Sequence, residues 1–272
     1  MSLPRCEPAR WALPDLHSAS GCFETMRAYQ GKIFRLEPHL DRLEGSIAHL
    51  GLRPSVDRAT LARRLRQALA RSEIREAMVR VALIPDARRM ASPSIVVQPV
   101  PLPTATAYRR GIRVTIVPTR RFPVNQIDPQ AKFSARLGSV LAVMEAQLRG
   151  VEEAVFLDGT TGVVTESTAS NLGLIKAGAF LASPCEFGLL AGVTWHAVAE
   201  LAPTIGLTVR PTPLTRHDCY NADEAFMLST LKEILPVTVI DGRRIGDGRP
   251  GPYTRRLHRA FRALVTRELR LS

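Results

Sequence analysis

The residue best suited to amine chemistry is Lys132, which lies in the run DPQAKFSARLGSVLAVMEA at positions 128–146. The chain contains only four lysines among its 37 basic residues, so arginine is its usual cation. An arginine keeps its proton near neutral pH, whereas a lysine loses it when the amine is desolvated or lies beside other positive charge. A lysine on an apolar segment is therefore a candidate nucleophile or general base, and it needs partners elsewhere in the chain.

Two later segments offer groups that suit a phosphate. Gly192, Val193 and Thr194 open an apolar helix in LLAGVTWHAVAEL, where free backbone amides, the helix dipole and a threonine hydroxyl favour an anion. The strand in FMLSTLKEILPV ends in Ser229 and Thr230, which add further hydroxyls and amides. Taken alone, each segment is equally compatible with an ordinary helix cap or strand end.

A carboxylate follows a short apolar strand in TGVVTESTASNLGLI. Glu166 ends that strand, and small hydroxyl residues and Asn171 come after it. By itself Glu166 is equally compatible with a surface carboxylate. The order and spacing of all these segments together carry more information than any one of them.

In order and spacing these segments resemble the class IV pyridoxal-phosphate aminotransferase family. The resemblance begins with GCFETMRAYQGKIFRLEPHLDRLEGS, whose family form is an F-E, an arginine, a glycine and an H-L-x-R-L helix. It continues through Lys132, the E-x4-N segment, the G-[IV]-T turn and DEAFMLSTLKEILPV, and it ends in IGDGRPGPYT. It implies a transaminase that moves an amino group between an amino acid and a 2-keto acid with the cofactor pyridoxal 5′-phosphate.

The resemblance also implies a role for each matching residue. Lys132 matches the lysine that forms the internal aldimine and later moves the proton at the substrate carbon. Glu166 matches the carboxylate that pairs with the pyridine nitrogen, which keeps the ring cationic and its electron sink deep. We interpret Asn171 as a structural residue that holds the loop presenting Glu166. The matching phosphate ligands are Arg42 in HLDRL, Val193, Thr194 and Thr230.

The substrate positions leave two activities open. Branched-chain enzymes carry N-Y-L shortly after the lysine, whereas this chain has A-R-L at 135–137, and its R-L pair resembles aminodeoxychorismate lyase, which releases pyruvate to give 4-aminobenzoate. The arginine of MVRVALIP and the IGDGRPGPYT tail favour an aminotransferase instead. We expect an aminotransferase with an arginine-rich pocket, and the lyase is the alternative. The candidate substrate contacts are Arg80, Arg88, Arg136 and Leu231.

Two of these candidates follow from position. Arg136 lies four residues after Lys132, one helical turn away, so we expect it to contact either the phenolic oxygen of the cofactor or a substrate carboxylate. Arg88 and Arg89 lie in the loop of IPDARRMASPS, which lacks the R-G motif common in lyases and D-amino acid enzymes. An arginine fork there would bind a carboxylate well.

The resemblance and the order of predicted elements indicate a two-domain fold of mixed class, α+β and α/β. A small α+β N-terminal domain is expected over residues 1–102, a proline-rich linker over 103–110, and a large C-terminal cofactor-binding domain with a mixed, barrel-like sheet over 111–272. The first domain should contain a hairpin turning at 30–32, a helix from Pro38 that stops at Gly51, a helix at 57–72, and strands at 77–85 and 94–100. The second should contain strands at 112–118, 153–158, 172–175, 207–211 and 224–228, and helices at 137–149 and 193–203.

Composition limits the remaining classes. The 272 residues are 45% hydrophobic, and neither a run of about 18 apolar residues nor a signal-like amino terminus is present, so we expect a cytoplasmic protein without a membrane partner. The four cysteines show no metal-binding spacing, and we expect no metal site. The net charge of +12 comes largely from arginines interleaved with apolar residues at helical spacing, so we expect solvated helix faces and no nucleic-acid partner. Family members are homodimers with the cofactor cleft near the subunit interface, and the resemblance implies the same here.

Overall fold

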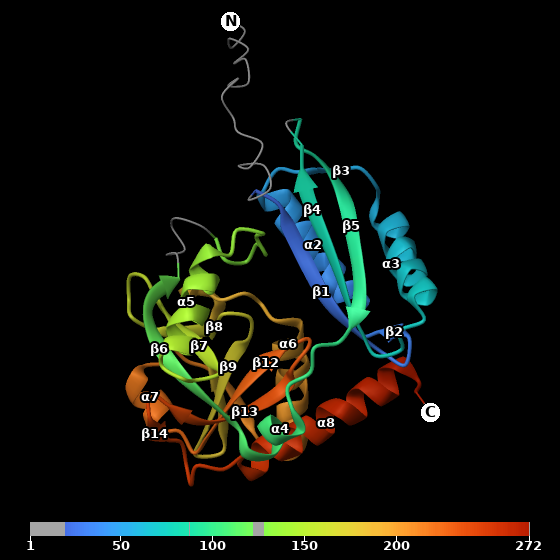
Figure 1. Cartoon of the computed structure of the whole chain (residues 1–272). Coiled ribbons are helices and arrows are strands. Elements are labelled where there is room, and N and C mark those ends of the chain that lie inside the picture. The colour runs from blue at the N-terminus through green and yellow to red at the C-terminus, as the bar shows by residue number, and fades with distance from the viewer. Residues whose placement is uncertain (1–19, 87, 122–127, 272) are drawn as a thin grey trace, which may run out of the picture.

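The computed structural model describes residues 20–86, 88–121 and 128–271. Residues 1–19, with which the predicted small domain begins, lie outside the described part. The strands form two sheets (Figure 1): those of the first lie between residues 22 and 99, and those of the second between 112 and 244. The predicted linker lies between the two sets of strands and contains a short helix, α4 (Ala105–Arg110), which the proline-rich composition did not indicate.

The first sheet has five strands in the order β2-β1-β4-β5-β3. Helices α2 (Leu36–His49) and α3 (Arg58–Ser72) pack their leucines against one face of it. β1 and β2 form the predicted hairpin, and its turn residues Gln30 and Gly31 have φ angles of 48° and 79°, as a tight two-residue turn requires. The strands are β1 Cys22–Tyr29, β2 Lys32–Ile33, β3 Arg53–Pro54, β4 Ala77–Pro85 and β5 Met90–Pro99.

The helix limits follow from local chemistry. The Asp57 side chain accepts a hydrogen bond from the Thr60 amide and caps α3, as the pattern predicts. The helix predicted to start at Pro38 begins two residues earlier, because Arg35 turns the chain with a φ of 50° and Pro38 falls in the first turn, where its missing N–H is tolerated. Gly51, with a φ of 58°, follows the end of α2 as predicted.

The second sheet closes on itself. Its order is β11-β10-β9-β12-β13-β6-β7-β8, and a pairing between Glu166 of β8 and Asn171 of β9 joins the two sides of the barrel. The predicted barrel-like sheet is confirmed, although several short strands had no clear signal in the sequence. The strands are β6 Ile112–Arg121, β7 Glu153–Asp158, β8 Val164–Ser167, β9 Asn171–Lys176, β10 Ala179–Ala182, β11 Thr208–Pro211, β12 Glu224–Ser229, β13 Glu233–Ile240 and β14 Arg243–Arg244.

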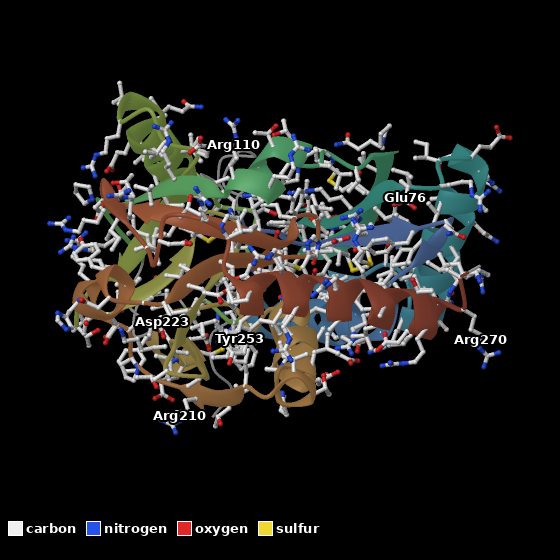
Figure 2. All side chains as sticks on the ribbon, turned by 90° about the horizontal axis from the view of Figure 1, so that it is seen from below. Glu76, Arg110, Arg210, Asp223, Tyr253 and Arg270 are labelled. Carbon is white, nitrogen blue, oxygen red and sulfur yellow. The ribbon has the colours of Figure 1, made fainter. Side chains whose placement is uncertain are left out.

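Helices from the second half surround the barrel. α5 (Leu137–Leu148) and α6 (Val193–Leu201) match the predicted helices to within two residues, and α7 (Arg216–Tyr220) is an additional short helix. The last helix, α8 (Pro252–Leu269), runs from the barrel toward the first sheet (Figure 1). Viewed from below (Figure 2), arginines such as Arg110, Arg210 and Arg270 lie at the outside of the molecule.

A shared apolar core joins the two halves. Tyr29 and Phe34 of the N-terminal half belong to the same buried cluster as residues of α6, α8 and the barrel. The ring of Phe34 packs edge-on against Phe261 of α8, with 5.6 Å between centroids. Because this cluster spans the junction, the N-terminal sheet and the barrel are fixed relative to one another where they meet.

Candidate active site

A cleft at this junction collects most of the predicted functional residues. The end of β12, the loop before α6, the end of β8 and α2 all contribute to its wall. All six residues predicted to bind the cofactor line it, and so does Arg136. The lining residues are Arg42, Lys132, Arg136, Glu166, Thr168, Ala169, Ser170, Asn171, Leu190, Gly192, Val193, Thr194, Leu228, Ser229 and Thr230.

The backbone of Lys132 is held by the N-terminal half of the chain. Its carbonyl accepts a hydrogen bond from the Phe23 amide at 3.1 Å, and its amide donates to the Ser46 hydroxyl at 3.0 Å. An isolated antiparallel β-bridge between the backbones of Cys22 and Phe133 continues this pairing along β1. The lysine therefore belongs to the second half by sequence, yet the first sheet and α2 set its position.

The surroundings of Lys132 favour its neutral form. Burial of the amine, followed by the positive charges of Arg42 and Arg136, lowers the pKa of Lys132 to about 8, although Glu24 and Glu166 act in the opposite direction. A neutral lysine amine is both a nucleophile and a base, whereas the ammonium form is neither. The lowered pKa gives this residue a substantial neutral fraction at mildly alkaline pH.

Arg42 is oriented by a carboxylate that the sequence reasoning did not select. Its guanidinium donates two hydrogen bonds to Glu24, at 2.6 and 2.9 Å, and a third to the Ala191 carbonyl at 2.7 Å. Burial alone would raise the pKa of Glu24, but Arg42 and the hydrogen bond to His39 hold it well below its usual range. Glu24 is thus an anion that aims Arg42 at the cleft. The F-E pair of the motif was the available signal for it.

His39 completes this buried cluster. Its Nδ1 lies 2.8 Å from a Glu24 carboxylate oxygen. Burial lowers the pKa of His39 below its ordinary value, although Glu24 opposes the shift. His39 therefore acts as a second orienting partner of Glu24, behind Arg42.

Glu166 faces the cleft from the end of β8. Its Oε2 accepts hydrogen bonds from the Asn171 side chain at 3.2 Å and from the Leu190 amide at 3.3 Å. The Asn171 amide also donates to the Leu190 carbonyl at 3.0 Å, so it ties the loop before α6 to Glu166, as the structural interpretation of Asn171 expects. A Cβ at Gly192 would lie 2.0 Å from Asn171 Oδ1, which leaves room only for glycine there.

Three basic side chains lie around the ring of Phe23. The guanidinium carbon of Arg80 lies 3.9 Å from the ring centroid, Lys132 Nζ lies 5.1 Å away and the guanidinium carbon of Arg136 lies 6.0 Å away. Arg136 also donates to the Thr168 carbonyl. Phe23 itself was not predicted. The two guanidinium groups beside one aromatic ring favour an anion close to them.

Of the four substrate candidates, only Arg136 is among the residues that line the cleft, and Arg80 lies beside it against Phe23. Arg88 is exposed, and its backbone amide donates to Asp86. The Leu231 carbonyl accepts a hydrogen bond from Arg27 at 3.0 Å. Arg89 donates to the Leu50 and Gly51 carbonyls, so it closes the end of α2 and does not form the expected carboxylate fork. Arg80 and Arg136 are the substrate candidates that the geometry places near Lys132.

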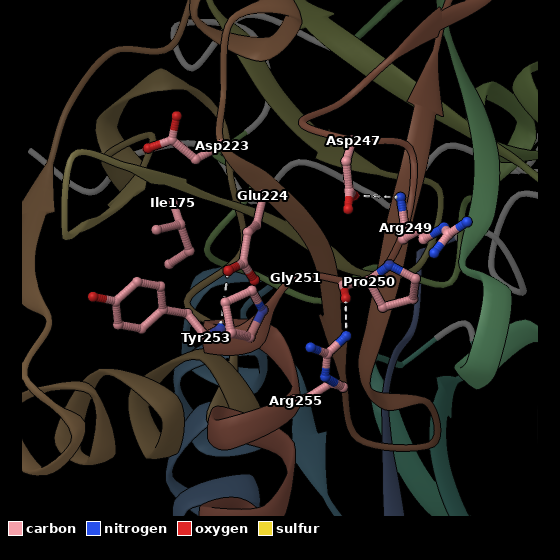
Figure 3. Close-up of a pocket in the computed structure, with 10 residues that line it drawn as sticks. Ile175, Asp223, Glu224, Asp247, Arg249, Pro250, Gly251, Tyr253 and Arg255 are labelled. Carbon is pink, nitrogen blue, oxygen red and sulfur yellow. Dashed lines mark hydrogen bonds between the residues drawn. The ribbon is translucent and has the colours of Figure 1, made fainter.

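A second cavity, of about 460 Å³, lies at the start of α8 (Figure 3). There the carboxylate of Glu224 accepts hydrogen bonds from the Tyr253 amide at 2.9 Å and the Thr254 amide at 2.7 Å. Glu224 thus satisfies the free amides of the helix start. None of the predicted site residues lines this cavity. Among the residues that the structure describes, no group of three His, Cys, Asp or Glu side chains could hold a metal ion.

Labelling of the cofactor-free protein with an amine-directed acylating reagent at a series of pH values tests the state of Lys132. Because only the neutral amine reacts, we expect half-maximal labelling of Lys132 near pH 8. The Arg136→Gln variant removes one of the positive charges that lower this pKa, so its midpoint should lie at higher pH. A midpoint above about 10, the ordinary range for lysine, would contradict the desolvated environment; peptide mass spectrometry gives the site-specific readout.

Comparison with known proteins agrees with this arrangement. The family model described as amino-transferase class IV matches residues 21–240. A protein of Methanocaldococcus jannaschii, named provisionally as a branched-chain-amino-acid aminotransferase, is 35% identical over 254 residues, which cover 91% of this chain and 88% of that protein. The branched-chain-amino-acid aminotransferase of Escherichia coli is 31% identical over 270 residues, with 93% of this chain and 86% of that protein covered.

Solved structures give the same result. The crystal structure of the Escherichia coli branched-chain amino acid aminotransferase matches with a TM-score of 0.88 at 30% identity, covering 93% of this chain and 88% of that one. The T.th. branched-chain amino acid aminotransferase, solved with pyridoxamine 5′-phosphate, matches with a TM-score of 0.87 at 30% identity and covers 93% of this chain and 87% of that one. The predicted family and fold class are confirmed, and the chain belongs to the class IV aminotransferases, as an enzyme that catalyses transamination.

Proposed function

We propose that this enzyme uses pyridoxal 5′-phosphate, bound at Lys132, to move an amino group between an amino acid and a 2-keto acid. The observation that carries the proposal is the desolvated Lys132 amine, with its pKa lowered to about 8, in one cleft with Glu166 and Arg42. An amine, a carboxylate and an arginine are the three groups needed for the aldehyde, the ring nitrogen and the phosphate of this cofactor.

The phosphate end fits one side of the cleft. Arg42 supplies a fixed guanidinium, and Val193 and Thr194 lie at the start of α6, where free amides and the helix dipole favour an anion. Thr230 adds a hydroxyl from the turn after β12. Gly192 lets this loop approach closely the Asn171 side chain, which also donates to Glu166.

The reactive end fits the other side. When bound, pyridoxal phosphate supplies an aldehyde and a ring that withdraws electrons from the substrate α-carbon. Glu166 would hold a proton on the ring nitrogen by charge pairing, and Asn171 and the Leu190 amide keep its carboxylate in place. Neutral Lys132 would take the proton from the α-carbon and return it to the acceptor carbon.

Replacement of Lys132 by alanine tests the central assignment. The wild-type protein mixed with pyridoxal phosphate should develop a near-visible absorbance band, whereas Lys132→Ala should lack that band and lose at least about a thousandfold in transamination rate. Lys176→Ala, which removes an exposed lysine, is the matched control and should retain both. An unchanged band in Lys132→Ala would contradict the proposal.

The cations around Phe23 point to a substrate that carries a second carboxylate. Arg80 and Arg136 both lie against this ring, as Lys132 does, and the guanidinium groups could bind a side-chain carboxylate while the α-amino group reacts at Lys132. We propose that a dicarboxylic amino acid or keto acid is one of the two substrates. The sequence and structural relatives are named for branched-chain amino acids. We propose that a branched-chain amino acid or its keto acid is the other substrate.

Steady-state kinetics test this substrate assignment. In Arg136→Leu or Arg80→Leu, the KM for a dicarboxylic keto acid should rise roughly 10- to 100-fold, the range expected for loss of a hydrogen bond to a charged group. The KM for a branched-chain keto acid should change much less. Arg88→Leu, which changes an exposed arginine outside the cleft, is the matched control. Equal losses for both keto acids would contradict selective carboxylate binding.

Arg136 lies in the cleft and belongs to the R-L pair that resembles aminodeoxychorismate lyase. The lyase reaction is therefore the second candidate function. The two reactions differ in what they consume. If aminodeoxychorismate released pyruvate without an added keto acid, the chain would have the lyase reaction as a second activity. A strict requirement for a keto acid identifies the aminotransferase.

We also propose that the enzyme is a homodimer that covers α5. This helix is apolar over most of its surface, yet only Ala142 and Ala146 are buried, against the cluster of Val117 and Phe156. Its large apolar side chains are exposed, up to 87% for Leu148. A helix that is apolar on nearly all sides is normally buried, so a second copy of the chain is the occupant we infer. The exposed side chains are Leu137, Val140, Leu141, Val143, Met144 and Leu148.

Sedimentation analysis checks the dimer. The wild-type protein should sediment with twice the mass of one chain, and the double variant Leu141→Glu with Met144→Glu should sediment as a monomer, because two buried and unpaired carboxylates oppose association. Arg64→Glu, on the exposed face of α3, is the control and should remain dimeric. A monomeric wild-type protein would contradict the proposal.

We also propose that the chain has two domains with a boundary within residues 103–110, and that it is located in the cytoplasm. In the described part of the chain no helix is both long and apolar enough to span a membrane.

A further inference from the structure

The turn after β12 brings Thr230 into the cleft and leads directly to Glu233. Ser229 and Thr230 line the cleft, and the chain then reverses into β13. Within the turn, the Lys232 amide donates a hydrogen bond to the Ser229 hydroxyl at 3.2 Å. The position of Thr230 therefore depends on the contacts that residues 229–233 make with the rest of the protein.

Glu233 is a completely buried carboxylate that binds both halves of the molecule. On β1, the Tyr29 hydroxyl donates a hydrogen bond to its Oε1 at 2.9 Å, and Arg27 Nη1 forms an ion pair with the same oxygen at 2.9 Å. On α8, His258 Nε2 lies 2.6 Å from its Oε2, and Arg262 Nε donates to the same oxygen at 2.7 Å. Burial would raise the pKa of Glu233, but His258 and the two arginines hold it below its usual range. The group is an anion shared by β1 and α8.

Two side chains that contact this cluster also hold the turn itself. Arg27 Nη1, besides binding Glu233, donates to the Leu231 carbonyl at 3.0 Å. Tyr108 of α4 stacks on His258 with 5.3 Å between ring centroids, and its hydroxyl donates to the Lys232 carbonyl at 2.9 Å. The carbonyls of two successive turn residues are thus fixed by groups that Glu233 orients, directly or through His258.

The backbone of Glu233 itself is strained. Its φ is 56°, in the left-handed region that disfavours side chains other than glycine, asparagine and aspartate. Such a conformation persists only where surrounding contacts determine it. Here the four partners of the carboxylate provide those contacts, which glycine, the residue with the most suitable backbone, could not make.

We infer that Glu233 is a positioning residue for the cofactor site: through Arg27 it orients the 229–232 turn so that Thr230 meets the phosphate. The inference rests on the proposed function, because it takes Thr230 as a phosphate ligand. Glu233 does not touch the cleft itself. Its effect on binding should therefore be confined to the phosphate, while groups at Lys132 and Glu166 are left unchanged.

Comparison of two ligands isolates that effect. Pyridoxal and pyridoxal 5′-phosphate differ only in the phosphate, and absorbance titration of the cofactor-free protein gives a dissociation constant for each. In Glu233→Gln the constant for pyridoxal phosphate should rise roughly tenfold, the loss expected for one hydrogen bond to a charged group. The constant for pyridoxal should stay within about twofold, because pyridoxal makes no phosphate contact.

Matched variants separate positioning from general loss of stability. Arg27→Lys retains the charge beside Glu233 but not the guanidinium that also reaches Leu231, and it should show the same phosphate-selective loss; it decides the case if Glu233→Gln does not fold. Glu224→Gln removes another buried carboxylate, the one at the start of α8 (Figure 3). It should lower the melting temperature without changing the ratio of the two dissociation constants.

The Thr230→Val variant distinguishes failure of the positioning inference from failure of the proposed function. If Thr230→Val loses phosphate selectivity while folded Glu233→Gln and Arg27→Lys keep it, the positioning inference is overturned and the proposed cofactor site stands. If Thr230→Val itself binds both ligands as the wild type does, the proposed phosphate role of Thr230 fails. Equal weakening of both ligands in Glu233→Gln, Arg27→Lys and Glu224→Gln would reduce Glu233 to a stabilising residue and would also overturn the inference.

Discussion

The arrangement of this enzyme depends on holding one partly buried amine beside fixed positive charge. Burial and the charges of Arg42 and Arg136 lower the pKa of Lys132, and this shift requires rigid surroundings because it depends on where the amine and the charges lie. The first sheet supplies that rigidity through backbone hydrogen bonds from β1, and α2 adds the Ser46 hydroxyl. The reactive group of the second half is thus held by the first half, and neither half forms the site alone.

Two buried carboxylates hold the side chains that meet at the junction around this amine. Glu24 aims Arg42 at the cleft and has His39 behind it. Glu233 binds β1 and α8 together below the turn that carries Thr230. A buried carboxylate is unfavourable unless cations and hydrogen bonds surround it, and in both clusters the carboxylate binds side chains of other elements: α2 for Glu24, and β1 and α8 for Glu233. The charges that make the junction specific therefore also fix the positions of the residues that face the cleft.

Local elements were predictable where a local cause exists. The hairpin of β1 and β2 follows from a glycine turn between apolar strands, and the start of α3 follows from the Asp57 cap. Closure of the barrel through Glu166 and Asn171, and the strained backbone at Glu233, have no comparable signal. Both arise from pairings between segments that the chain brings together only when it folds.

The same distinction holds for the site. The scarcity of lysine singled out Lys132, and the family resemblance carried by the order and spacing of the motifs assigned Glu166 and the phosphate ligands, because each motif taken alone is also compatible with an ordinary structural role. The sequence could not show that Phe23 has three basic side chains around it, nor that Arg88 is exposed and does not line the cleft. The chemistry that a side chain can perform follows from its residue type and can be inferred from the sequence. Its pKa, its orientation and its contacts with a substrate depend on distances that are set only when the two halves of the chain pack together.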